Sequence, residues 1–188
     1  NTEPTPVGAI IQAVRANLNS EARTQNKNIR VDLDEELFVN VNPRLAEQAI
    51  ANLVSNAIRY CPEGSTVSIH AEPVQPADPL SDDPANQPAT QPSEVAIFVA
   101  AEGPGIPAEP LPRLFDRIYR VDKARSREKG GTGLGLAIVK HIAKVHGGSV
   151  SVDSVLGKGT TFRLTFPSAQ AQETVKISSN KSLWAPPP

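Results

Sequence analysis

The uneven distribution of proline is the sequence feature that most limits how this chain can fold. Of its 18 prolines, six lie between Pro73 and Ser93 and three end the chain. Each proline fixes φ and removes a backbone donor, so this density excludes core helices and central strands. Few apolar residues lie here to offset the entropy lost on folding. We therefore expect residues 73–93 to form a Pro-rich disordered insertion and residues 168–188 a flexible C-terminal tail.

Proline-rich segments also bind the aromatic grooves of partner proteins, which is an alternative role for the insertion. The rest of the chain, residues 1–167, has enough apolar residues for one compact domain. A formal net charge of −1 excludes a uniformly basic nucleic-acid-binding protein. The lone cysteine, Cys61, cannot form an internal disulfide, which favours a reducing compartment. Apolar runs fall short of the roughly 18 residues of a membrane span, and the first residues lack a signal-peptide pattern.

The apolar periodicity alternates between the spacing of helices and that of strands. It predicts three helices, at residues 10–22, 42–60 and 134–145, and strands at residues 29–33, 38–41, 66–71, 95–99, 149–153 and 160–166. This pattern is typical of an α+β fold, a two-layer sandwich in which a mixed sheet of five to six strands packs against three helices. The proline-rich insertion falls between two of the strands, at the tip of their hairpin.

The helix at residues 42–60 carries an unusual polar stripe. Asn52 and Asn56 are four residues apart and Arg59 follows three later, so all three lie on one face of a helix that is otherwise apolar. Asparagine lowers helix propensity, and a buried amide must find partners. An amide oxygen suits Mg²⁺, Arg59 suits a phosphate, and Tyr60 suits a planar base. The alternative is a solvent-facing helix with two ordinary amides.

Two glycine-rich segments flank a basic stretch of the chain. Glu102-Gly103-Pro104-Gly105-Ile106 follows a strand, whereas residues 130–136, GGTGLGL, open directly into a helix. Glycines before a helix expose free N–H groups and the positive end of the helix dipole, which favours anion binding. No G-K-[ST] follows, so the segment is not a Walker loop. Residues 113–129 between them contain seven Lys or Arg against three acids, which suits nucleotide phosphates or an ordinary solvated helix face. Residues 157–161, GKGTT, form a third glycine segment or a simple hairpin turn.

In this order, the segments resemble the catalytic ATP-binding domain (Bergerat fold) of bacterial sensor histidine kinases, the ATP-dependent transferases of two-component signal transduction. The asparagine box corresponds to residues 52–60, the first glycine box to 101–106, the phenylalanine box to 114–120, the second glycine box to 131–139 and the last to 157–160. The resemblance covers residues 7–167 apart from the insertion. It implies Mg-ATP binding and phosphorelay to a histidine.

The resemblance also implies a role for individual residues. Asn56 is expected to coordinate Mg²⁺, Asn52 and Arg59 to contact phosphates, and Tyr60 to lie against the adenine. Residues 120–130 are expected to form a lid over the γ-phosphate, and the amides of residues 133–136 to hold phosphate oxygens. The full set of expected ATP-binding residues is Asn52, Asn56, Arg59, Tyr60, Ala101, Gly103, Gly105, Ile106, Tyr119, Arg120, Lys123, Gly131, Thr132, Gly133, Leu134, Gly135, Leu136 and Thr160.

One position departs from the family pattern. The first glycine box of the family begins with an aspartate that hydrogen-bonds the adenine amino group, and here that position is Ala101. The neighbouring Glu102 should point the opposite way in an extended segment. Losing a charge-assisted hydrogen bond costs ~1.5–3 kcal/mol, which predicts weakened ATP affinity. A nucleotide-deficient pseudokinase acting as a protein-interaction module is therefore the alternative function. A hydrolysing ATPase is disfavoured, because the catalytic glutamate of that class is replaced by Asn52, which cannot take a proton.

The phosphoacceptor histidine of the family is absent from its usual context. None of His70, His141 and His146 lies on a dimerisation helix of the expected type. We therefore expect a monomeric fragment that cannot autophosphorylate alone. Its expected partners are the phosphoacceptor and dimerisation domain of the same kinase and a response regulator, with no nucleic acid or membrane contact. We expect it to be the cytoplasmic part of a membrane-anchored sensor.

Overall fold

The computed structural model describes residues 1–33, 36–74, 94–117, 119 and 133–169. Its elements follow the predicted alternation of helices and strands. In chain order they are β1 (Glu3–Pro6), α1 (Val7–Thr24), β2 (Asn28–Asp32), β3 (Phe38–Val41), α2 (Pro43–Tyr60), β4 (Thr66–Val74), β5 (Glu94–Glu102), the short 3-10 helix η1 (Leu111–Arg113), α4 (Gly135–Val145), β6 (Ser149–Val155) and β7 (Gly159–Pro167).

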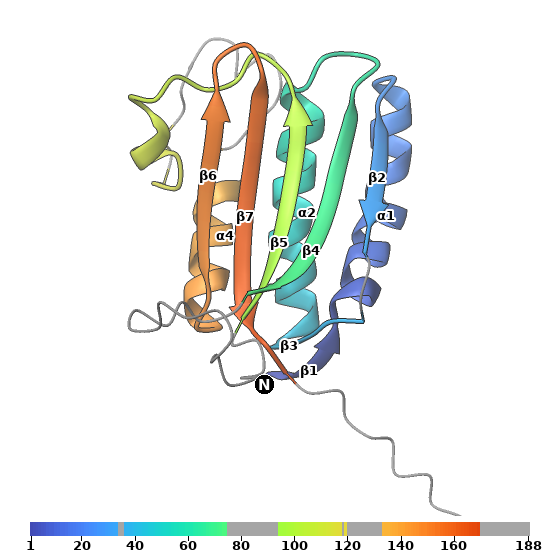
Figure 1. Ribbon diagram of the computed structural model, residues 1–188, viewed down its shortest axis with the longest axis vertical. Coiled ribbons are helices and arrows are strands. Elements are labelled where there is room, and N and C mark those ends of the chain that lie inside the picture. Colours follow the sequence, from blue (N-terminus) through green and yellow to red (C-terminus); the bar gives the residue numbers. More distant parts are fainter. Residues whose placement is uncertain (34–35, 75–93, 118, 120–132, 170–188) are drawn as a thin grey trace, which may run out of the picture.

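Five of the strands form one mixed sheet in the order β2-β4-β5-β7-β6 (Figure 1). The β2–β4 pair is parallel, with β3 and the helix α2 forming the connection between the two strands, and the other three pairs are antiparallel. The three α-helices that the described residues form cover the same face of this sheet, which confirms the predicted two-layer α+β sandwich. The carboxyl ends of α1, α2, β5 and β6 lie at one end of the molecule, at the top in Figure 1.

The core fills the space between the helices and the sheet. Alternate residues of β4 and β5, among them Ile69 and Ile97, are fully buried against α2, whose Ile50 and Leu53 are also inaccessible. The helix begins where predicted, since the Asn42 side chain accepts a hydrogen bond from the Leu45 amide at 3.2 Å. Burial of this continuous apolar layer is the main stabilising contribution to the fold.

The strand prediction differs from the structure at the beginning of the chain. Residues 38–41 form a strand, as predicted, but it pairs outside the main sheet with β1, which the sequence pattern did not reveal. Pro4 and Pro6 made this segment an improbable strand, yet proline is tolerated in a short two-stranded ribbon. Ser168 and Ala169 extend this ribbon, because the Ala169 amide donates to the Phe38 carbonyl at 2.8 Å. Two residues assigned to the expected tail therefore pair with the folded domain. Pro73 and Val74, assigned to the expected insertion, likewise belong to β4 and pair with Val95 and Glu94, while residues 75–93 lie outside the described residues.

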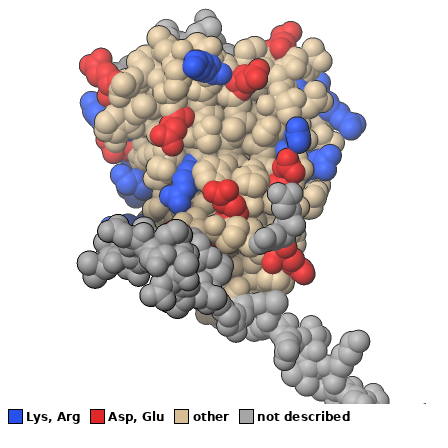
Figure 2. All heavy atoms as spheres, viewed as in Figure 1, with Lys and Arg blue, Asp and Glu red and all other residues tan. Residues whose placement is uncertain are grey.

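The opposite face of the sheet faces the viewer in Figure 2, and the part of the chain that the structure describes forms no helix on it. Lys and Arg are interspersed there with Asp and Glu around an uncharged centre. The central pair His70 and Phe98 stack with ring centroids 6.0 Å apart. His70 is thus a surface residue of β4, and His141 is exposed on α4. Neither charge sign dominates this face, in agreement with the near-zero net charge of the chain.

Candidate functional site

The predicted polar stripe of α2 lies on the side of the helix that adjoins α4. Asn52, Asn56 and Arg59 are half-buried, whereas Leu53 and Ile58 on the other side are fully buried. Tyr60 ends the helix and is 39% exposed. The four predicted residues therefore form one continuous surface that leads to the carboxyl end of α2.

The amide of Asn52 is the most informative atom group of this surface. Its Nδ2 is buried and has no hydrogen-bond partner among the described residues. A buried amide donor without an acceptor costs about 1–3 kcal/mol, so such a group is typical of a ligand-binding position. A phosphate oxygen is an acceptor that would satisfy it.

The beginning of α4 lies directly against Asn52. A Cβ atom placed on Gly135, the first residue of α4, would lie 3.7 Å from Asn52 Oδ1. Gly133 precedes the helix with φ +72°, a conformation that side chains other than glycine rarely adopt. The fold therefore brings the N–H groups at the start of α4 to the asparagine stripe. The sequence pattern indicates phosphate binding for each of these two motifs separately.

The first glycine box packs against the hairpin between β6 and β7. A Cβ on Gly105 would lie 2.2 Å from the Val155 carbonyl oxygen, and the Gly157 amide donates to the Pro104 carbonyl at 2.8 Å. Gly105 also has φ +67°. This glycine is therefore required by the hairpin, a structural role in addition to the ATP-binding role expected for it. Gly103 approaches the end of α2 instead, with its added Cβ 3.6 Å from the Tyr60 carbonyl oxygen.

Ala101 and Thr160 are direct partners in the β5–β7 ladder. The next helix-facing pair along the ladder is Val99 and Phe162, both buried in the core, so Ala101 and Thr160 continue the same face of the sheet. Glu102 is exposed, as its position on the alternate face predicts. A methyl group thus occupies the helix-facing position at which the resemblance implies a carboxylate.

The phenylalanine box anchors the connection after the first glycine box. Phe115 is buried, with its ring centroid 6.4 Å from that of Phe162 in an edge-to-face arrangement. The Arg113 guanidinium lies 4.6 Å from the centre of the Tyr119 ring. Four of the predicted ATP-binding residues, Arg120, Lys123, Gly131 and Thr132, lie outside the described residues, as does most of the basic stretch.

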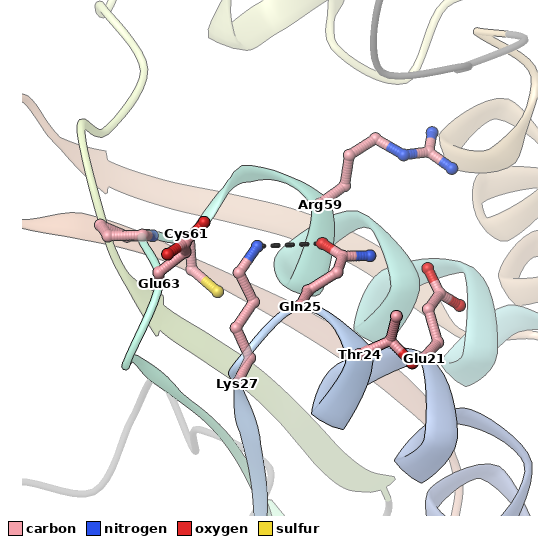
Figure 3. Close-up of a pocket in the computed structure, with 8 residues that line it drawn as sticks. Glu21, Thr24, Gln25, Lys27, Arg59, Cys61 and Glu63 are labelled. Carbon is pink, nitrogen blue, oxygen red and sulfur yellow. Dashed lines mark hydrogen bonds between the residues drawn. The ribbon is translucent and has the colours of Figure 1, made fainter.

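A pocket lies behind the carboxyl end of α2, where that helix meets the end of α1 (Figure 3). It is lined by Glu21, Thr24, Gln25, Lys27, Arg59, Cys61, Pro62 and Glu63. Arg59 is its only lining residue from the predicted set, and its side chain extends away from Lys27 in Figure 3. Arg59 is therefore shared by this pocket and the polar stripe of α2, whereas Asn52 and Gly135 are not among the lining residues.

Lys27 closes the inner side of this pocket. It is 94% buried, with 6% of its surface exposed, and its Nζ donates to Gln25 Oε1 at 3.1 Å and to the Ile58 carbonyl oxygen. The Ile58 carbonyl belongs to the last turn of α2, where a cation complements the helix dipole. Lys27 therefore fixes the turn that carries Arg59 and Tyr60, a contribution that sequence analysis missed because it depends on a contact across 31 residues.

The described residues suit a metal ion that takes one or two ligands from the protein and the others from the phosphates of a bound nucleotide and from water. No group of three His, Cys, Asp or Glu side chains comes together in the described part of the chain. The half-buried Asn56 instead offers an amide oxygen, and Mg²⁺ commonly takes one or two protein ligands with phosphates and waters completing its shell. Within the described ranges, no helix has the length and apolar character needed to cross a membrane.

Comparison with known proteins places this geometry among ATP-binding domains. Residues 41–170 match the family model described as histidine kinase-, DNA gyrase B- and HSP90-like ATPase. The sensor histidine kinase WalK of Bacillus subtilis is 40% identical over 140 residues, which cover 74% of this chain and 20% of WalK. SenX3, a sensor-like histidine kinase of Mycobacterium tuberculosis H37Rv, is 42% identical over 139 residues, covering 74% of this chain and 30% of SenX3.

Solved structures show the same fold. The nucleotide-free catalytic domain of histidine kinase ThkA superposes with a TM-score of 0.70 at 24% identity, covering 89% of this chain and 95% of that domain. Full-length ShkA in complex with AMPPNP gives a TM-score of 0.72 at 23% identity, covering 91% of this chain and 32% of ShkA. The chain spans between a fifth and a third of the length of the curated relatives named above.

Proposed function

The chain belongs to the family of histidine kinase-, DNA gyrase B- and HSP90-like ATPases, as a catalytic ATP-binding domain of the sensor histidine kinase type, and we propose that it binds Mg-ATP and transfers the γ-phosphoryl group to a histidine. The observation that carries this proposal is the buried, unpartnered Nδ2 of Asn52 beside the start of α4. The acceptor histidine belongs to a separate dimerisation domain in this proposal, and a response regulator receives the phosphoryl group next.

Each part of the described surface has a distinct task in this proposal. Asn52 and the N–H groups before α4 hold phosphate oxygens, Arg59 neutralises phosphate charge, and Asn56 supplies an amide oxygen to Mg²⁺. The metal, when bound, neutralises charge on the phosphates. Phosphoryl transfer demands little covalent chemistry from the protein, so positioning and charge neutralisation carry the catalysis. Asn52 cannot act as a general base for water, which favours transfer over hydrolysis.

Ala101 favours a second candidate, a pseudokinase domain that binds nucleotide poorly and acts through protein contacts. Its methyl group cannot accept a hydrogen bond from the adenine amino group. Replacing a charge-assisted hydrogen bond with none costs ~1.5–3 kcal/mol, equivalent to a roughly 10- to 100-fold loss of affinity. We accordingly propose that the natural chain binds Mg-ATP weakly rather than not at all.

Calorimetric titration with the analogue AMPPNP and Mg²⁺ separates the two candidates. We expect measurable but weak binding by the natural chain, and a roughly 10- to 100-fold tighter dissociation constant for Ala101→Asp. Ala100→Asp is the matched control, because Ala100 lies on the opposite face of the same strand. The kinase proposal is contradicted if neither the natural chain nor Ala101→Asp binds the analogue. Micromolar binding by the natural chain that Ala101→Asp leaves unchanged would instead contradict the role given to position 101.

A further inference from the structure

A cluster of two hydroxyl groups joins the first glycine box to the β6–β7 hairpin. Ser154 and Thr160 face each other in the β6–β7 ladder, and their hydroxyl oxygens are 2.8 Å apart. The Ser154 hydroxyl oxygen is also 2.9 Å from the Gly159 carbonyl oxygen and 2.8 Å from the Ile106 amide nitrogen. Both side chains are half-buried. Ser154 thus has three hydrogen-bond partners, which is the full capacity of a hydroxyl group.

The partners of Ser154 determine the direction of every hydrogen bond in the cluster. A backbone carbonyl only accepts and a backbone N–H only donates, while a hydroxyl has one proton and two lone pairs. The Ser154 proton is therefore donated to the Gly159 carbonyl, and one lone pair accepts from the Ile106 amide. The bond between the two hydroxyls must then be donated by Thr160. With its proton engaged, the Thr160 oxygen presents only lone pairs to any other group.

This acceptor lies beside the position where the family aspartate is replaced. Thr160 pairs directly with Ala101, and both residues continue the helix-facing side of the sheet. Four strands contribute to this row of residues, which runs from Val67 through Ala101 and Thr160 to Ser154. Among these four side chains, Thr160 and Ser154 alone carry polar atoms, and of these two only Thr160 pairs directly with Ala101.

We propose that Ser154 is a positioning residue that makes Thr160 a fixed hydrogen-bond acceptor and thereby selects a purine with a 6-amino group over one with a 6-oxo group. The inference rests on the proposed function, since it concerns how the base of the nucleotide is chosen. An adenine amino group donates to the Thr160 oxygen. The 6-oxo group of hypoxanthine, which only accepts, meets a second acceptor there and is disfavoured.

The test compares the dissociation constants of Mg-ADP and Mg-IDP, which differ in the base at the 6-position and the neighbouring N1. The natural chain is expected to prefer ADP. Ser154→Ala frees the Thr160 hydroxyl to rotate and donate, so the preference should fall by about tenfold, in line with loss of one net hydrogen bond. Ser154→Thr keeps the hydroxyl and should preserve the ratio. A purely structural role of Ser154 would weaken both nucleotides equally and leave the ratio unchanged.

Thr160→Val completes the test and remains informative if Ser154→Ala fails to fold. This substitution removes the acceptor, so it should also reduce the preference for ADP over IDP. The double variant Ser154→Ala/Thr160→Val should discriminate between the two nucleotides no less than Thr160→Val alone. An unchanged ratio in Ser154→Ala or in Thr160→Val, where that variant folds, overturns the inference while leaving the proposed function intact. If the natural chain binds both nucleotides equally, the inference is again overturned alone. If it binds neither, the proposed function fails as well.

Discussion

Asn52 shows at the scale of a single residue how stability is given up for binding. Its Nδ2 is buried beside Gly135 without an acceptor in the described part of the chain, which costs the nucleotide-free protein about 1–3 kcal/mol. The same atom gains an acceptor when a phosphate oxygen binds. A residue of this kind is expected to raise ligand affinity and to lower the stability of the free protein.

Replacing Asn52 with leucine should therefore separate the two properties. We expect Asn52→Leu to raise the free energy of unfolding of the nucleotide-free chain by about 1 kcal/mol, because an unsatisfied donor is replaced by an apolar group of similar shape. Affinity for Mg-AMPPNP should fall at least about tenfold. Urea denaturation and calorimetry measure the two effects. Gln48→Leu, an exposed amide on the same helix, is the control. A variant that is less stable than the natural chain yet binds equally well would contradict this role.

At the scale of elements, His146 joins the end of α4 to the beginning of α2. Its Nδ1 donates to the Ile142 carbonyl at 2.8 Å, and its Nε2 accepts from the Asn42 amide at 3.1 Å. His146 is only 8% exposed, and its ring centroid lies 5.9 Å from that of Phe166 in an edge-to-face arrangement. Because Asn42 caps α2, this one side chain holds both helices of the candidate site in place.

Removing this imidazole should destabilise the domain. We expect His146→Ala to lower the free energy of unfolding by about 2–3 kcal/mol, because it leaves the Asn42 amide without its acceptor and opens a cavity against Phe166. The effect is measured by urea denaturation monitored by circular dichroism. His141→Ala, an exposed histidine one turn earlier on α4, should change stability by less than about 0.5 kcal/mol. Equal effects of the two substitutions would show that the link between the helices contributes nothing.

At the scale of the whole molecule, local sequence patterns predicted most of the fold. They did not predict a strand that depends on pairing with a segment far away in the chain. The three α-helices of the described residues and the five strands of the main sheet lie within about three residues of their predicted bounds at every end, because each has its own apolar periodicity. β1 was missed, since Pro4 and Pro6 suppress the strand signal and its partner β3 lies more than 30 residues away. Tertiary pairing outweighed local propensity there.

The residues of the candidate site likewise fall into two groups, those that local motifs predict and those that depend on distant contacts. Asn52 and Gly135 were predicted from two separate short motifs, and the fold places them next to each other. Lys27 and Ser154 could not, because an isolated lysine or serine carries no signal until its partner is known. Those partners, Ile58 and Ile106, lie 31 and 48 residues away in the chain. Residues that position a site are set by tertiary contacts rather than by motifs.

The location of the nucleotide tests the central claim most directly. In ¹H–¹⁵N correlation spectra recorded during titration with Mg-AMPPNP, we predict saturable shifts of the side-chain amides of Asn52 and Asn56 and of the backbone amides of Gly105 and Gly135. Residues at the end of α1 that line the pocket, such as Thr24, should move little. Shifts confined to that pocket, or none at millimolar Mg-AMPPNP, would contradict the claim that this surface binds ATP.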